Sequence, residues 1–423
     1  MSMSSRICDR IARRLVLRLL AHTRGGELTI VEGAERLRFG ERVPARPVRA
    51  CIEVHSPRFY RSLLHGSVGL CESYMDGLWD CDDLVSLTRF AALNVRPLDS
   101  ARRVLAPLTI PFQRWLRWLA RNTPRRARKR VAAHYDLGNE LFSLFLDPTM
   151  MYSCAVFDSP AASLQEASLA KLELVCRKLD LRAEDHVLEI GGGWGGFAVY
   201  AAERYGCRVT TTTISREQHS YATERVRAAG LQDRVTVLLK DYRELLGSYD
   251  KLVSIEMIEA VGWQFLGTYF RRCSELLRAD GAMLLQAIVI DDRAYQVEKA
   301  SKSFINTYIF PGGCLPSLPI ISRTLARVTD LSKVHIEDIT PHYAETLARW
   351  RERFLAAGEH LHALGYDERF RRLWELYLSY CEGGFRERRI ENVQLLLAKP
   401  GYRAAAAPLT PAASLSLSAS STK

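Results

Sequence analysis

The stretch 186–195, which reads HVLEIGGGWG, predicts a β-strand, a glycine turn and the first turn of a helix. Positions 187–190 form a short apolar run of the kind found in buried parallel strands. Gly191, Gly193 and Gly195 follow, and residues without a Cβ allow a tight turn there. A strand, a glycine turn and a helix N-terminus together bring backbone N–H groups close to a ligand. The stretch therefore predicts an α/β fold with a ligand site at this turn.

The glycines alone leave the identity of that ligand open. Gly191, Gly193 and Gly196 also satisfy the G-x-G-x-x-G pattern of nicotinamide and flavin dinucleotide sites, and a purely structural turn is a further alternative. Glu189 lies at the strand tip, where a carboxylate can meet the ammonium group of a ligand. The next strand, 208–215, ends in hydroxyls and lacks the acid that binds ribose in dinucleotide sites. These features favour S-adenosylmethionine over NAD.

Strand and helix patterns alternate downstream of the turn. Amphipathic segments predict helices at 163–179 and 216–229, and the second of these begins after Ser215 as its N-cap. Four more segments predict strands, at 208–215, 234–239, 249–255 and 281–288. This alternation predicts a doubly wound, Rossmann-like parallel sheet with ligands at the carboxyl ends of its strands. Polar residues follow two of those ends, Asp241 with Tyr242 and Glu256 with Glu259.

The length of 423 residues exceeds what one hydrophobic core usually supports, so we expect more than one domain. Residues 1–110 predict a smaller N-terminal α+β accessory domain, because a basic amphipathic helix precedes short alternating segments. Residues 111–130, PFQRWLRWLARNTPRRARKR, read as a basic linker, and residues 131–400 as the main sheet domain. Residues 401–423 are rich in alanine, serine and threonine, which predicts a disordered tail.

The net charge of +11 points to an anionic partner. No uninterrupted apolar run reaches the roughly 18 residues that a bilayer-spanning helix needs. Trp115 and Trp118 lie among the clustered arginines of the linker, a combination typical of membrane interfaces, although a solvated linker is the alternative. Because no nucleic-acid-binding module is visible, the pattern favours an anionic membrane surface over nucleic acid. The ten cysteines lack metal-ligand spacing, which predicts reduced thiols in a cytoplasmic protein and no metal site.

Several segments taken together resemble the cyclopropane fatty acid synthase family, which shares its fold with mycolic acid methyltransferases. The resemblance is strongest over 134–394 and rests on the segments HYDLGNELF, MYSCAVF, VLEIGGGWGGFA, TISREQ, YIFPGGCLPS, HYAETLARWRERF and YCEGGFR. It implies an S-adenosylmethionine methyltransferase sheet whose substrate is the unsaturated acyl chain of a membrane phospholipid. It also implies a cytoplasmic protein peripherally associated with the inner face of the membrane, and a homodimer.

The resemblance assigns roles to individual residues. A bicarbonate ion that serves as base would contact Cys154, Glu259, the carbonyl of Ile288 and Tyr343. Gln286 stands where the family usually has a histidine, and an amide still donates a hydrogen bond but cannot become cationic. The cofactor S-adenosylmethionine would be surrounded by Tyr152, Ser153, Glu189, Gly191, Gly193, Gly195, Thr213, Ser215, Gln218, Asp241 and Tyr242.

Structural interpretations of the same residues stay open beside these roles. Glu259 beside an anion predicts a raised pKa for its carboxyl group, but this residue could instead cap a helix. Tyr343 could be a core aromatic residue, and Gln286 a polar residue at a strand end. Cys381 matches a cysteine assigned to the active site in the family, but the chemistry requires no cysteine nucleophile, so we expect a structural role.

The implied reaction places a methyl group on a double bond and leaves a carbocation on the acyl chain. Aromatic faces stabilise such a cation, and the candidates are Phe157, Tyr308, Phe310 and Tyr343. Removal of a proton from the new methyl group then closes a cyclopropane ring. The alternatives are a 10-methylene product formed after a hydride shift, a small-molecule methyltransferase, and a catalytically inactive lipid-binding protein.

Overall fold

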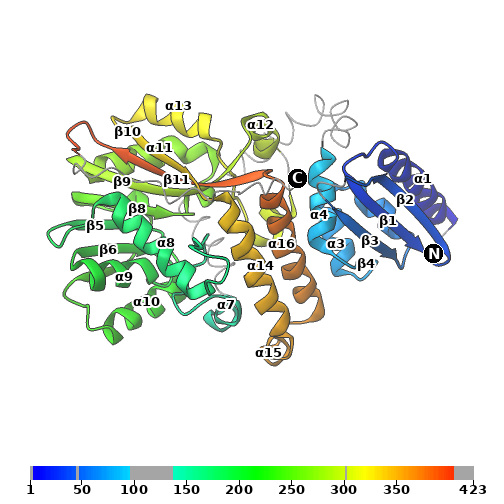
Figure 1. Cartoon of the computed structure of the whole chain (residues 1–423), viewed down its shortest axis with the longest axis horizontal. Helices are drawn as coiled ribbons and strands as arrows, with labels where there is room; N and C mark the ends of the chain where they lie inside the picture. Colours follow the sequence, from blue (N-terminus) through cyan, green and yellow to red (C-terminus); the bar gives the residue numbers. More distant parts are fainter. Residues whose placement is uncertain (1–2, 44–46, 96–136, 301–302, 404–423) are drawn as a thin grey trace, which may run out of the picture.

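The computed structural model describes residues 3–43, 47–95, 137–300 and 303–403, and they form two sheets with helices around them (Figure 1). The small sheet near the N-terminus has four strands, and the large sheet has seven. The predicted linker 111–130 and residues 404–423 of the predicted tail lie outside the described residues. The domain boundaries that depend on them therefore stay predictions.

The large sheet confirms the predicted doubly wound arrangement. Its strand order is β10-β11-β9-β8-β5-β6-β7, and the pairs from β9 to β7 are all parallel. Strands β6 and β7 lie on one side of β5, and the chain then crosses over so that β8 and β9 lie on the other side. This reversal creates a crevice at the carboxyl end of β5, the usual ligand position in such sheets. The parallel strands are β5 His186–Ile190, β6 Arg208–Thr213, β7 Val235–Leu239, β8 Tyr249–Ile255 and β9 Leu277–Ile290.

Two further strands extend the sheet at its β9 edge, and the sequence patterns did not predict them. Strand β10 (Ser332–Asp338) and strand β11 (Ile390–Ala398) pair with each other, and β11 also pairs antiparallel with β9. Helix α13 (Leu318–Val328), which precedes β10 in the chain, was not predicted either. Strand β10 lies at the sheet edge and carries exposed charged residues, so its hydrophobic alternation is weak.

Helices cover both faces of the large sheet. On one face, α8 (Leu164–Leu179), α9 (Gly196–Tyr205) and α10 (Arg216–Ala228) share an apolar core with the strands. On the other face, α11 (Leu266–Leu276) and α13 pack against β8, β9 and β11. Ser163 begins α8 with a reciprocal capping box, and Ser215 caps α10 as the sequence predicted. The remaining short elements here are α7 (Asn139–Phe145), α12 (Asp292–Ala300), the 3₁₀ turns Tyr242–Glu244, Ile258–Ala260 and Trp263–Phe265, and a π turn at Ile305–Ile309.

The small N-terminal unit has the predicted α+β composition. Its strands, in the order β2-β1-β3-β4, are β1 (Gly26–Glu32), β2 (Glu35–Glu41), β3 (Arg49–Val54) and β4 (Trp79–Cys81). Its helices are α1 (Met3–Leu20), α2 (Arg58–Leu63), α3 (Gly66–Met75) and α4 (Leu84–Leu93). Between this unit and the large sheet lie α14 (Thr340–Ala356) and α16 (Glu368–Arg386), joined through α15 (Gly358–Ala363) (Figure 1). One continuous hydrophobic core runs from the small sheet through α14 and α16 to α7.

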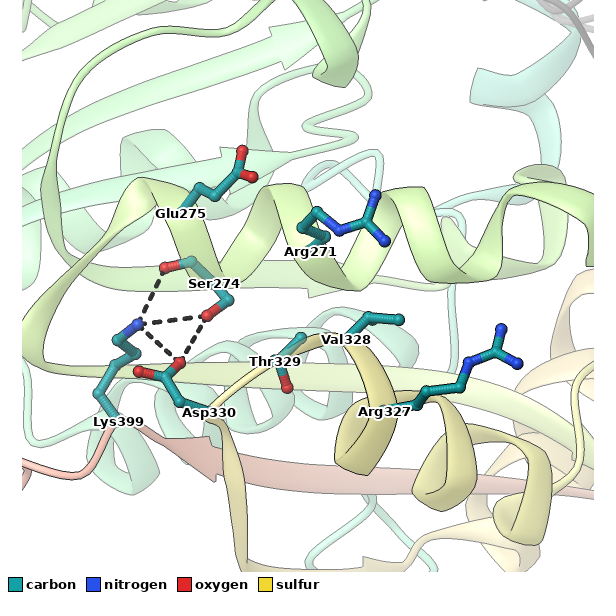
Figure 2. Close-up of a pocket in the computed structure, with 8 residues that line it drawn as sticks. All are labelled: Arg271, Ser274, Glu275, Arg327, Val328, Thr329, Asp330 and Lys399. Atoms are coloured by element: carbon teal, nitrogen blue, oxygen red, sulfur yellow. Dashed lines mark hydrogen bonds and ion pairs between the residues drawn. The ribbon is translucent and has the colours of Figure 1, made fainter.

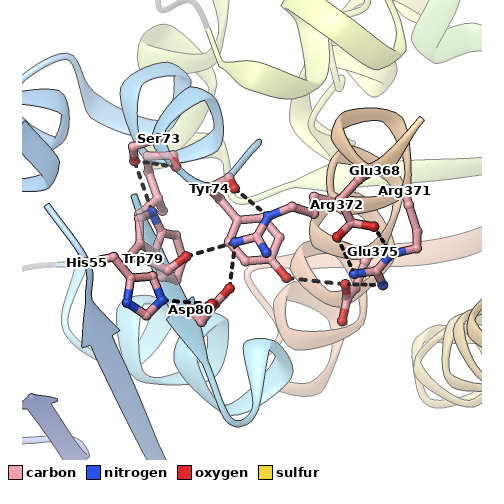
Figure 3. A network of polar contacts seen from close by, with 10 residues as sticks. His55, Ser73, Tyr74, Trp79, Asp80, Glu368, Arg371, Arg372 and Glu375 are labelled. Carbon is pink, nitrogen blue, oxygen red and sulfur yellow. Dashed lines mark hydrogen bonds and ion pairs between the residues drawn. The ribbon is translucent and has the colours of Figure 1, made fainter. Parts of the chain in front are cut away.

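Arg372 on α16 is the main polar link between the two units (Figure 3). Its guanidinium donates to the backbone carbonyl oxygens of Tyr74 at 2.5 Å and Trp79 at 2.8 Å, and to Asp80 Oδ1 at 2.7 Å. The same group lies 3.9 Å from the ring centroid of Tyr74. The Arg372 side chain is 12% exposed, so its two contacts with backbone carbonyls are partly shielded from water, whereas its contact with Asp80 is exposed. The neighbouring Arg371 instead pairs with Glu368 and Glu375 of its own helix, also drawn in Figure 3.

We expect Arg372→Met to lower the free energy of unfolding by about 2–4 kcal/mol, because it removes hydrogen bonds from a charged donor and a cation–π contact. Urea unfolding followed by tryptophan fluorescence measures this loss. The matched control is Arg371→Met, which removes partly exposed ion pairs and is expected to cost less than about 1 kcal/mol. Equal losses in the two variants would contradict the assignment of Arg372 as the link.

Candidate active site

The predicted glycine turn lies at the carboxyl end of β5, where the strand order reverses. Gly191, Gly193 and Gly195 have φ angles of 89°, 54° and 81°, which side chains with a Cβ rarely adopt. At Gly192 a side chain is excluded by a steric clash, because a Cβ there would lie 1.8 Å from Thr211 Oγ1. The turn therefore keeps its backbone accessible from the crevice, as the sequence predicted.

A cleft opens at this turn, between the ends of β5, β6 and β8. Nine of the predicted cofactor residues line it: Tyr152, Ser153, Glu189, Gly191, Gly193, Thr213, Gln218, Asp241 and Tyr242. The other two do not line it, because Gly195 precedes α9 behind the turn and Ser215 caps α10. The structure thus brings together most of the predicted set, although the roles of these residues stay predictions.

The polar groups at the β5 and β6 ends are buried and hydrogen-bonded to each other. Glu189 accepts a 2.6 Å hydrogen bond from Thr211 Oγ1. Burial raises the pKa of the Glu189 carboxyl group to about 7, against the opposing effects of that hydrogen bond and of Lys171. Thr213 Oγ1 donates to Gln218 Oε1 at 2.7 Å, which orients the Gln218 amide. A carboxyl group with a pKa near neutrality suits a cationic ligand, because the ligand favours the ionised form.

Lys171 is a buried cation that the sequence analysis missed. Its ammonium group donates to Ser153 Oγ at 3.0 Å, and burial lowers the pKa of Lys171 to about 8. The negative charges of Glu256 and Glu189 act in the opposite direction and favour the charged lysine. In the sequence Lys171 reads as an ordinary residue of the amphipathic helix α8, so no local signal distinguishes it.

A second polar cluster lies beside the same cleft and is centred on the carboxylate of Glu256, which is among the residues that line it. Glu256 Oε1 accepts hydrogen bonds from the backbone N–H of Cys154 at 3.0 Å, Gln286 Nε2 at 2.8 Å and Asn392 Nδ2 at 2.6 Å. Glu256 Oε2 accepts from the hydroxyl of Tyr343 at 2.6 Å. Four donors from separate segments therefore converge on one carboxylate group.

Glu256 holds this position with a backbone φ of 50°, in the left-handed region that favours glycine. A non-glycine residue in such a conformation costs on the order of 1–3 kcal/mol, and it persists only when its surroundings fix it. The sequence analysis noted Glu256 only as a residue at a strand end. Asn392 was missed with its strand β11. The only signal in the sequence was a pair of glutamates directly after a predicted strand.

The predicted bicarbonate ligands are brought together, but their hydrogen bonds go to protein carboxylates. Cys154, Gln286 and Tyr343 all donate to Glu256. The N–H of Ile288 donates to Glu259 Oε1 at 2.5 Å. Because the Glu256 carboxylate accepts the hydrogen bonds of these donors, the residues present do not fit a bound bicarbonate ion.

Glu259 is the acid next to this cluster. The pKa of its carboxyl group is raised to about 8, first by burial and then by the negative charge of Glu256. The raised pKa of Glu259 agrees in direction with the prediction. The neighbouring negative charge is that of the Glu256 side chain, whereas the prediction named a bound anion. Glu259 Oε2 is buried without a hydrogen-bond partner among the described residues. At neutral pH this side chain is therefore mainly the uncharged acid.

Neither Cys154 nor Cys381, the two cysteines that the resemblance assigns to the site, is activated as a nucleophile. The Cys154 thiol is buried beside backbone carbonyl oxygens, and burial raises its pKa well above the usual value. Burial also raises the pKa of the Cys381 thiol to about 12. The thiolate is the reactive form, so both side chains remain thiols at neutral pH.

Aromatic rings pack around Tyr152, which lines the cleft. Tyr152 has Phe310 and Trp350 within 6.4 Å and 5.2 Å, measured between ring centroids, and its hydroxyl contacts that of Tyr377 at 2.8 Å. Tyr308 lies elsewhere, because it is 38% exposed and donates to Glu72 of α3 at the contact between the two units. The structure therefore places Phe310 near the site and removes Tyr308 from the aromatic candidates.

A second hollow lies between α11 and α13, at the end of the large sheet opposite to the glycine turn (Figure 2). Lys399 lines it and donates to Asp330 at 2.7 Å and to Ser274 at 3.2 Å. It contains none of the predicted site residues and lies at the end where β9 begins, away from the glycine turn.

Among the described residues, no helix is long and apolar enough to cross a membrane, and no group of three metal-ligating acids, histidines or cysteines occurs.

Comparison with known proteins gives consistent matches. Residues 122–395 match the family described as "Mycolic acid cyclopropane synthetase". The chain is 40% identical over 346 residues to the tuberculostearic acid methyltransferase of Mycobacterium tuberculosis (strain ATCC 25618 / H37Rv), covering 80% of each protein. It is also 40% identical over 358 residues to the cyclopropane-fatty-acyl-phospholipid synthase of Escherichia coli (strain K12), covering 83% of this chain and 88% of that protein.

Solved structures agree with these sequence matches. A cyclopropane synthase from Mycobacterium tuberculosis superimposes with a TM-score of 0.60 at 31% identity, over 64% of this chain and 98% of the other. A mycolic acid cyclopropane synthase complexed with SAH and CTAB gives a TM-score of 0.60 at 33% identity over the same shares.

Proposed function

Because the chain belongs to the mycolic acid cyclopropane synthetase family, we propose that it transfers the methyl group of S-adenosylmethionine to a double bond of phospholipid acyl chains and closes a cyclopropane ring. It is an S-adenosylmethionine-dependent methyltransferase of the cyclopropane fatty acid synthase type. The observation that carries the proposal is one cleft lined both by the glycine turn and by Glu256. A site for a cationic methyl donor and a site for a proton acceptor are therefore neighbours.

In this proposal the chain contributes position, shielding and charge. S-adenosylmethionine supplies an electrophilic methyl group when it is bound. Glu189 and Gln218 hold the donor against the glycine turn, and this fixed geometry lowers the barrier to attack by a weakly nucleophilic double bond. Rings such as those of Tyr152 and Phe310 keep water from the cationic acyl chain and stabilise its charge. The carboxylate cluster faces the reacting carbon with negative charge.

A 10-methylene chain, the precursor of a methyl-branched chain, is the second candidate product. It is favoured by one specific observation, since the relative named tuberculostearic acid methyltransferase is as similar to the chain as the cyclopropane-fatty-acyl-phospholipid synthase, at 40% identity. Both products share the methyl transfer and the carbocation. They differ in whether a hydride shifts before the proton is lost.

The test is incubation of the full chain with S-adenosylmethionine, labelled in its methyl group, and vesicles of monounsaturated phospholipid. Mass spectrometry of the released fatty acids separates a ring from a methylene branch. We expect the labelled carbon in a cyclopropane. Calorimetric binding of S-adenosylmethionine without any labelled lipid would instead favour the lipid-binding protein or the small-molecule methyltransferase.

The proposed membrane contact uses α1, a helix on the far side of the small domain from the large sheet (Figure 1). Ile7, Ile11 and Leu15 are spaced four residues apart and are 52%, 53% and 48% exposed, while Ala12 and Val16 face the core. Exposed arginines flank this apolar stripe, at positions 6, 10, 14 and 18. An exposed apolar stripe bordered by cations matches the interface of an anionic bilayer. We accordingly propose a peripheral position at the cytoplasmic face of the membrane, and the homodimer stays a prediction.

We expect the double variant Ile7→Ser/Ile11→Ser to bind anionic phospholipid vesicles about tenfold or more weakly, because each isoleucine contributes on the order of 1 kcal/mol when its exposed half is buried. Cosedimentation with vesicles measures the bound fraction. The control is Leu246→Ser in the main domain, since Leu246 is 79% exposed and outside the stripe. Unchanged binding by the double variant, or an equal loss in the control, would remove α1 from the contact.

A further inference from the structure

We infer that Glu256 is the base of the proton-removal step, so that the protein carries in its own chain the anion that the reaction needs. The inference rests on the proposed function, because only a methyl transfer to a double bond creates the proton to be removed. It deepens that function by assigning the acceptor to one side chain. It also accounts for the poor fit of the predicted bicarbonate ligands.

The geometry of the surrounding donors supports this assignment. A carboxylate and a bicarbonate ion share a planar O–C–O group, and the predicted anion ligands Cys154, Gln286 and Tyr343 all donate to Glu256. Asn392 adds a further donor at 2.6 Å. A set of four donors within 3.0 Å of one carboxylate fixes its position and its orientation. The strained backbone at Glu256 is consistent with a side chain that its surroundings hold in place.

Oε2 is the oxygen of Glu256 that can accept the proton. Glu256 Oε1 already accepts three hydrogen bonds, whereas Oε2 accepts one, from Tyr343. Oε2 therefore keeps a lone-pair direction for an incoming proton. Glu256 lines the same cleft as Gly191 and Gly193, where the methyl donor would bind.

The chemistry of the step requires only a weak base. Protons next to a carbocation are strongly acidic, so a weak base with hydrogen-bonded oxygens is sufficient to remove one. In the step, a C–H bond of the transferred methyl group breaks and its electron pair forms the last C–C bond of the ring. The proton ends on Glu256 Oε2, and the cationic charge of the acyl chain is cancelled. No further reactant is needed.

The neighbouring acid is the less suitable acceptor. Glu259 Oε1 accepts the N–H of Ile288, and this side chain is largely protonated at neutral pH because it is buried beside the Glu256 charge. Lys171, buried nearby, partly balances the negative charge of Glu256. Glu256, which four donors hold in place, is therefore the better placed acceptor, and Glu259 is its neutral neighbour.

The experiment measures product formation in buffer depleted of carbon dioxide, with and without added sodium bicarbonate. For the native protein we expect the same rate in both buffers. Glu256→Gln keeps the size of the side chain and is expected to lose at least about 100-fold in rate, the usual range for a missing general base. Calorimetry checks that the affinity of this variant for S-adenosylmethionine stays within a few-fold of native.

Glu256→Gly is the decisive second variant. Its positive φ suits glycine, so the backbone is relieved of strain, and the four donors are left around a space of carboxylate size. We expect the same loss in depleted buffer and a recovery of at least tenfold on addition of bicarbonate, whereas Glu256→Gln should not recover.

Three results would overturn the inference. They are a native rate that falls on depletion of carbon dioxide, a Glu256→Gln variant that keeps its rate, and a Glu256→Gly variant that bicarbonate does not restore. Failure of the proposed function would look different, because the native protein would then bind S-adenosylmethionine and label no lipid in either buffer.

Discussion

Gly193→Val is expected to abolish measurable binding of S-adenosylmethionine while the protein remains folded. A Cβ on Gly193 would meet no atom closer than Gln218 Nε2 at 4.0 Å, so the new side chain would enter the cleft without a clash in the ligand-free protein. There it would occupy the space between the glycine turn and Gln218, where we place the donor. We expect a loss of more than about 100-fold in affinity, because the backbone can no longer approach the ligand.

The matched control is Gly230→Val. Gly230 has a φ of 68°, close to the 54° of Gly193, and has open space around its Cβ position away from the cleft. Both variants should therefore lose a similar 1–2 kcal/mol of stability from backbone strain, roughly the cost of a left-handed L-residue. Isothermal titration calorimetry and thermal unfolding separate the two effects. Native-like affinity in Gly193→Val would place the donor elsewhere.

The parallel part of the large sheet could be predicted because its signals are local. Strands β5, β7, β8 and β9 contain apolar runs, β6 is rich in β-branched threonine, and the glycine turn and the Ser215 cap mark where helices begin. β10 and β11 could not be predicted in this way. They depend on pairing with β9 across a long stretch of chain, and the edge strand shows little hydrophobic alternation.

The cofactor side of the site could likewise be predicted, whereas the centre of the anion cluster could not. The resemblance drew attention to Glu259, but the donors converge on Glu256 three residues earlier. Asn392 reaches Glu256 only because β11 pairs with β9, and Lys171 reaches Ser153 only because α8 packs on the sheet. These contacts form between segments that are far apart in the sequence, so they could not be predicted from the spacing of residues.

Gln286, the departure from the family pattern, has a definite place in this cluster. Its Oε1 accepts from Gln394 Nε2 at 2.9 Å, which directs its Nε2 towards Glu256 at 2.8 Å. A neutral amide supplies a directed donor without a titratable charge. The cation near Glu256 is instead Lys171, which no residue pattern had predicted.

The affinity for S-adenosylmethionine should depend on pH through Glu189. The pKa of this buried carboxyl group is about 7 in the ligand-free protein, and a cationic donor binds the ionised form. As the pH falls below 7, a growing fraction of Glu189 is protonated, so the affinity should fall by up to about tenfold per unit. Above pH 7 the carboxylate is already ionised and the affinity should level off. Calorimetry between pH 5.5 and 7.5, at about half-unit steps, measures this slope and stays below the pKa of Lys171, about 8.

Glu189→Gln should remove that slope and weaken binding at neutral pH by about 10- to 100-fold, the usual cost of losing a charged hydrogen-bond partner of 1.5–3 kcal/mol. The variant should not be less stable at pH 8. A raised pKa in the folded state means that folding favours the protonated form of Glu189, so this residue contributes stability at low pH that is lost as the pH rises through about 7. Weaker binding with an unchanged or higher unfolding temperature would therefore report the ligand contact itself. A native affinity that is flat with pH, or a Gln variant that keeps the slope, would show that another group meets the positive charge of the donor.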